Sequence, residues 1–131
     1  NYNVSELLDS CLSKNSKRTI NILNENNFTL EDCILIIRSF SVKLKRLHKI
    51  HKEYQKNKNL DLIIASYKPP IFWKDKDSIK KQMYKSGLKN IEDMIFKTND
   101  IELLIKKNSD NAVNIMSDFI IDTSKQSSSD L

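Results

Sequence analysis

Glycine is nearly absent from this sequence, which has only Gly87 among its 131 residues. Average usage of about 7% would give roughly nine glycines. The phosphate-binding loops of P-loop and Rossmann domains need several closely spaced glycines, because only glycine lets backbone amides approach a phosphate closely. The sequence therefore excludes both of these classes of nucleotide-binding domain.

Cysteine and histidine are also scarce, with two residues of each type. Cys11 and Cys33 are too few for a disulfide scaffold and lack paired metal-ligand spacing, so we expect two buried thiols in a reducing compartment such as the cytoplasm. His48 and His51 can share one face of a helix, but no third ligand stands near them in the sequence. We therefore expect no metal site and no cofactor.

Long hydrophobic runs are missing. The longest, Cys33 to Ile37, is far shorter than the roughly 20 apolar residues that span a bilayer, and no basic-then-apolar signal segment opens the chain. We expect a cytoplasmic protein without a membrane contact. Because the first residue is Asn1 and not methionine, we also expect the chain to be either a processed protein or a domain of something longer.

Arginine is rare beside lysine, and the formal net charge of +5 is unevenly placed. Arg38 to Lys58 carries eight basic residues against one acidic residue, whereas Ile91 to Leu131 carries four against eight. The basic stretch is typical of a solvated helix face. Alternatively, it can follow a nucleic-acid backbone without sequence specificity, because lysines alone supply that part of DNA binding.

Apolar residues recur with helical period along nearly the whole chain, which predicts an all-α domain. Thr29 is a suitable N-cap for a long helix, since its hydroxyl can accept from the amide of Asp32. The expected buried seam of that helix consists of Cys33, Ile37, Phe40, Leu44, Leu47, His51 and Tyr54. Its expected outer face carries Lys43, Lys45, Arg46, Lys49, Lys52 and Lys56.

Shorter helices are expected on both sides of this long one. Gly87 is predicted to end one of them as a left-handed stop. The predicted helices span Val4 to Leu12, Ser16 to Glu25, Leu60 to Ser66, Ile71 to about Lys85, a long segment with a stripe of Ile91, Met94, Ile95, Thr98, Glu102 and Ile105, and Ala112 to about Thr123 with Val113, Met116, Phe119 and Ile120 inside. Together these patterns predict a compact bundle of five to six helices over residues 1–124 and a flexible polar tail over 125–131.

No set of residues predicts catalysis. The carboxylate pairs, such as Glu92 with Asp93, are adjacent on helices and point about 100° apart, so they cannot flank one substrate. Neither cysteine has a base placed beside it by the sequence. We therefore expect a domain without enzymatic activity and without catalytic residues.

Glu102 and Lys106 are spaced four residues apart on a helix, which allows a structural ion pair. Because Glu102 lies on the stripe expected to face inward, the pair can tie its helix to a neighbour. The functional alternative places Lys106 and Lys107 against a DNA backbone.

The most distinctive local cluster follows the double proline Pro69-Pro70, where Phe72 and Trp73 stand side by side. Two adjacent large aromatic residues cannot both enter one core stripe. Either one of them covers an interface, or both pack in the ordinary way.

Three stretches in this order resemble the C-terminal collar domain of the delta subunit of the bacterial DNA polymerase III clamp loader, most closely its alphaproteobacterial form. They are Val4 to Leu12 with the following Lys17-Arg18 and Ile22-Leu23, Pro69 to Lys74 with Gln82, and Asp100 to Lys106. Tyr84 stands where the family usually has tryptophan. The likeness covers about residues 4 to 122.

The resemblance implies a helical module that holds the clamp-loader pentamer together during loading of the sliding clamp. Its implied partners are the delta-prime and tau/gamma subunits, while contact with the sliding clamp would belong to domains absent from this chain. DNA contact would be non-specific. We expect the subunit interface at Pro70, Phe72 and Trp73 and, on the final helix, at Phe119.

Overall fold

The computed structural model describes residues 3–125, and all regular structure in this range is helical. The all-α prediction is confirmed, but the described chain has seven α-helices where five to six were expected. They are α1 (Val4–Leu12), α2 (Ser16–Asn24), α3 (Leu30–Lys56), α4 (Leu60–Ser66), α5 (Lys76–Lys85), α6 (Leu88–Lys107) and α7 (Ala112–Ser124), with two 3-10 turns, η1 (Trp73–Asp75) and η2 (Ser109–Asn111). None of the described helices has the length and apolar character to cross a membrane. Of the predicted tail over residues 125–131, only Lys125 is among the described residues.

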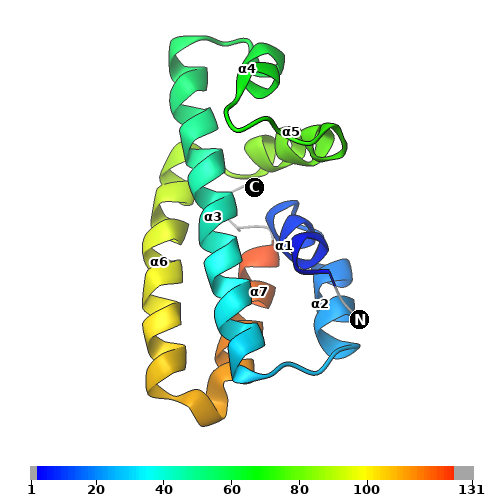
Figure 1. The fold of residues 1–131 in the computed structure, drawn as a ribbon, viewed down its shortest axis with the longest axis vertical. Coiled ribbons are helices and arrows are strands. Elements are labelled where there is room, and N and C mark those ends of the chain that lie inside the picture. The colour runs from blue at the N-terminus through cyan, green and yellow to red at the C-terminus, as the bar shows by residue number, and fades with distance from the viewer. Residues whose placement is uncertain (1–2, 126–131) are drawn as a thin grey trace.

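The long helix α3 is the centre of the arrangement. It begins at a capping box, in which the Thr29 hydroxyl accepts from the Asp32 amide at 3.1 Å and the Asp32 carboxylate accepts from the Thr29 amide at 2.9 Å. α6 lies antiparallel along it, and α7 turns back beside both (Figure 1). α1 and α2 cover one side of the lower half, while α4 and α5 gather at the end where α3 stops.

A single core joins these helices. Phe40 of α3 is fully enclosed in it, and its ring centroid lies 5.7 Å from that of Phe119 of α7. Other fully enclosed side chains of the core include Leu7, Leu8, Leu12, Ile36, Ile37, Leu44, Leu47, Ile50, Ile64, Ile79 and Ile91. The predicted seam of α3 is buried from Cys33 to Leu47, but beyond it Ile50 takes the inner position and His51 and Tyr54 are half-buried.

Gly87 does not end a helix in the left-handed conformation, so that prediction is wrong. Its φ of −77° and ψ of 174° are extended, and its carbonyl accepts from the Ile91 amide as α6 begins. The chain leaves α5 through Ser86, which is also extended. The turn between α5 and α6 therefore needs no positive φ, and a Cβ atom at residue 87 would meet no atom within 4 Å beyond its chain neighbours.

Two other local predictions differ from the structure. Residues Ile71 and Phe72 precede the helix that was expected to contain them, because the chain stays extended at Phe72 and makes the turn η1 before α5 begins. In α7, Val113 is exposed and Ala112 takes the inner position. The η2 turn lies directly before α7.

Candidate subunit interfaces

The segment between α4 and α5 presents an aromatic corner, which we define as Pro70, Phe72 and Trp73. Ile71 is buried and fixes the segment to the core, whereas Phe72 is 57% exposed and Trp73 is 69% exposed. The two aromatic rings contact each other, with centroids 5.9 Å apart and planes tilted at 51°. Pro70 is exposed beside them. Neither aromatic side chain enters the core.

The backbone explains why both rings point outward. Phe72 is extended, with φ −58° and ψ 134°, and its carbonyl accepts from the Asp75 amide at 2.9 Å to close the η1 turn. The η1 turn begins at Trp73 and continues directly into α5, while Ile71 before it points inward. The Lys74 ammonium lies 5.4 Å from the Trp73 ring centroid, a cation–π contact made at the surface.

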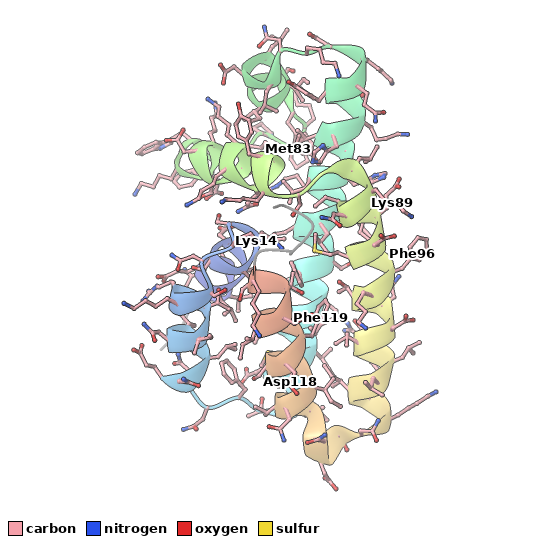
Figure 2. The ribbon with its side chains drawn as sticks, turned by 180° about the vertical axis from the view of Figure 1, so that it is seen from behind. Lys14, Met83, Lys89, Phe96, Asp118 and Phe119 are labelled. Atoms are coloured by element: carbon pink, nitrogen blue, oxygen red, sulfur yellow. The ribbon has the colours of Figure 1, made fainter. Side chains whose placement is uncertain are left out.

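A second candidate surface is a groove between α6 and α7 with a volume of about 550 Å³. Its apolar floor includes Ile101 and Phe119, and its rim carries Lys97, Asp118 and Lys125. Phe119 is only 8% exposed. Its ring contacts Phe40 of the core and also lines the groove, so the interface contact expected at Phe119 stays a prediction. Asp118, its neighbour on α7, is exposed (Figure 2).

The candidate ion pair on α6 is present and extends to α3. Lys106 donates to Glu102 at 2.8 Å, and the Arg38 guanidinium of α3 lies 3.2 Å from the other oxygen of the same carboxylate. The hydrogen bond from Lys106, reinforced by Arg38, lowers the pKa of Glu102 below its ordinary value of 4.5. The carboxylate thus joins the two longest helices. Lys106 is committed to it, whereas Lys107 is exposed and has no ion pair among the described residues.

Much of the basic stretch 38–58 is occupied by contacts within the chain. Lys43 lies 3.2 Å from Asp9 of α1, and His48 lies 3.0 Å from Glu92 of α6. The acidic partners come from segments far away in the sequence, so spacing along the helix did not reveal them. Further contacts join Arg38 to Glu102, Lys56 to Glu53, Lys49 to the Tyr67 ring and Lys58 to the Tyr54 ring.

The thiols and imidazoles make structural contacts. Cys11 and Cys33 are free and fully buried, and burial raises the pKa of Cys11 to about 12. The His51 ring nitrogen lies 2.8 Å from the Ser86 carbonyl, and burial lowers the pKa of this imidazole. Within residues 3–125, no three histidine, cysteine or carboxylate side chains gather as a metal site.

Comparisons with family models, curated proteins and solved structures give no match for this chain.

Proposed function

We propose that this chain is the oligomerisation domain of a clamp-loader delta subunit, a cytoplasmic protein, and that it helps to hold the pentameric collar together. The observation that carries the proposal is the aromatic corner. The segment that carries the most specific part of the sequence resemblance presents Phe72 and Trp73 to solvent, with 57% and 69% of their surface exposed.

Exposed paired aromatic side chains support a protein interface. Tryptophan and tyrosine dominate the binding energy of protein interfaces, and large apolar side chains are unfavourable in water unless a partner covers them. Buried Ile71 anchors the backbone of the corner to the core, so the segment itself needs little ordering on binding. The α6–α7 groove adds a second apolar surface with a charged rim.

This role requires no catalytic group in the domain. In the family that the sequence resembles, ATP hydrolysis and clamp contact belong to other domains and subunits. The delta-prime and tau/gamma subunits are the proposed partners, with their own collar domains as the direct contacts.

A nucleic-acid-binding domain is the alternative. The observation that favours it is a set of exposed lysines without ion pairs among the described residues, which includes Lys45, Lys52 and Lys107. These lysines can neutralise phosphates without reading sequence. Since many other cations of the stretch 38–58 already have intramolecular partners, this surface offers fewer free charges than the sequence predicts.

The test is light scattering on a sizing column, with this chain alone and then with the delta-prime and tau/gamma collar domains from the same source. We expect a defined hetero-complex that elutes ahead of each component. Failure to join these domains, in buffer where they assemble with each other, would refute the proposal. Binding of a DNA duplex by the isolated chain, lost steeply as salt rises, would then favour the alternative.

A further inference from the structure

Arg46 differs from the other two arginines of the chain. Arg18 pairs with Glu6, and Arg38 pairs with Glu102. Arg46, on α3, has no ion pair and no hydrogen bond among the described residues, although its Nε is fully buried. A guanidinium is a rigid fork of donors that matches the two oxygens of an oxyanion. Its charge is left without a partner in a place that is half enclosed.

Arg46 lines a surface pocket of about 280 Å³ between α1 and α3. Lys43, Ser5 and Ser39 line the same pocket, together with Val42. Two cations and two hydroxyl groups around one hollow form a donor set for an oxyanion, since each of them can donate to a negatively charged oxygen. Asp9 holds the Lys43 ammonium at 3.2 Å, which positions this side chain before any ligand arrives.

The pocket borders an exposed apolar stripe on α3. Leu35 is 53% exposed and Val42 is 70% exposed, and they are seven residues apart. Ser39 and Arg46 follow them at spacings of four, so all four side chains share one side of the helix. We call these four residues the α3 stripe.

Leu35 and Val42, one heptad apart, favour a second helix as the occupant, because residues at this interval lie on the same side of α3 and can pack against one helix laid along it. A nucleic-acid backbone would leave Leu35 and Val42 without a partner. Arg46, the cation of the stripe without an ion pair, favours negative charge on the incoming side. An amphipathic helix with an acidic residue beside its apolar face meets both requirements.

We propose that the α3 stripe docks an amphipathic helix of a partner protein, and that one aspartate or glutamate of that helix enters the pocket and pairs with Arg46 and Lys43. This inference deepens the proposed function by naming one contact of the oligomerisation domain. Both oxygens of the carboxylate would accept hydrogen bonds from the guanidinium. The two serine hydroxyls would donate to the remaining lone pairs of the same carboxylate.

The first test examines the site without any clamp-loader subunit. Nuclear magnetic resonance of the ¹⁵N-labelled chain gives one Nε–H signal for each arginine, and the R46K variant identifies the signal of Arg46. The probes are a synthetic helical peptide with leucines seven residues apart and a glutamate between them, the same peptide with glutamine, and single-stranded oligothymidine. We expect the glutamate peptide to shift the Arg46 signal and the Val42 methyl signals, and the glutamine peptide to shift them much less.

Other results would overturn the proposal. Equal shifts with both peptides would exclude the carboxylate contact. A response to oligothymidine alone would assign the pocket to nucleic acid, and no response to any probe would show that the stripe docks neither.

The second test uses the collar domains of the proposed partners and compares R46Q with K45Q. Both substitutions remove one positive charge from α3, but Lys45 is exposed and lies outside the pocket. We expect R46Q to weaken the complex about tenfold or more and K45Q to change it less than about twofold. R46K, which keeps the charge and loses the fork, should fall between them. Equal effects of R46Q and K45Q would refute the contact. If the wild-type chain joins no collar domain, the proposed function fails and the peptide titration still decides the site.

Discussion

Replacement of Trp73 by alanine separates a role in assembly from a role in folding. The side chain is 69% exposed in the isolated domain. A tryptophan can bury about 250 Å², so about 170 Å² remains for a partner to cover. At about 25 cal/mol for each Å², complete coverage would contribute about 4 kcal/mol to association.

The same arithmetic gives a smaller effect on the fold. About 80 Å² of Trp73 already contacts the chain, which corresponds to at most about 2 kcal/mol. Alanine retains part of this contact, so we expect the free energy of unfolding to fall by about 1 kcal/mol. Association with the proposed collar partners should fall by about 2 to 4 kcal/mol, or about 30-fold to several-hundred-fold in the dissociation constant.

The assay combines urea denaturation of the isolated domain with calorimetric titration against the partner collar domains. Phe96 provides a matched control, because it is 71% exposed and points outward from α6 on the side away from α7 (Figure 2). F96A should leave association within about threefold of wild type. An unchanged dissociation constant for W73A, with normal stability, would refute the assignment of the aromatic corner to the interface.

Four further predictions concern the fold. Substitution Phe40→Ala should lower the free energy of unfolding by about 3 to 5 kcal/mol in urea denaturation, because it opens a cavity at a fully buried position. Asp9→Ala should cost about 2 to 3 kcal/mol, since it removes the acceptor of the buried Gln82 amide, 3.0 Å away; Asp9→Asn, which keeps an acceptor oxygen, should cost less. Glu102→Gln should cost about 0.2 to 1 kcal/mol at neutral pH. Because the folded pKa of this carboxyl is lowered, its contribution is complete above its ordinary value of 4.5 and is lost as the pH falls through the folded value, so thermal melts of the two proteins should converge in acid. Cys11, with its pKa raised to about 12, should react with a thiol reagent at pH 8 no faster than the domain unfolds, as mass spectrometry would measure.

Elements with strong local signals could be predicted from the sequence. The apolar period of residues 4–12 and 60–66 predicted α1 and α4 with their observed bounds. Such a period depends only on residues within about two helical turns of each other, so it can be read from the local sequence. The Thr29 cap depends only on the amide three residues later and was predicted for the same reason. Gly87 was placed wrongly, since glycine permits a left-handed stop but does not require one.

Contacts between distant segments could not be predicted in this way. The spacing of Glu102 and Lys106 indicated their ion pair, but nothing in the sequence indicated that Arg38, 64 residues away, would share the carboxylate. Phe119 had the period of a buried residue and was also expected at an interface. Phe119 contacts Phe40, and this contact depends on how α3 and α7 cross, which the local sequence does not show.

The same limit explains why Arg46 had no special place among the basic residues of α3. In a lysine-rich chain, the density of positive charge gives little information about binding, because most of the charge is solvated or neutralised within the fold. What distinguishes one cation from another is whether a carboxylate reaches it, and that depends on the packing of α1 and α6 against α3. Lys43 is reached by Asp9 and Arg38 by Glu102, while Arg46 is reached by neither. The sequence shows where the cations are, but only the fold shows that no carboxylate of the described residues reaches Arg46 in its pocket. For this reason its substitution should affect a partner more than that of Lys45, an exposed lysine on the same helix.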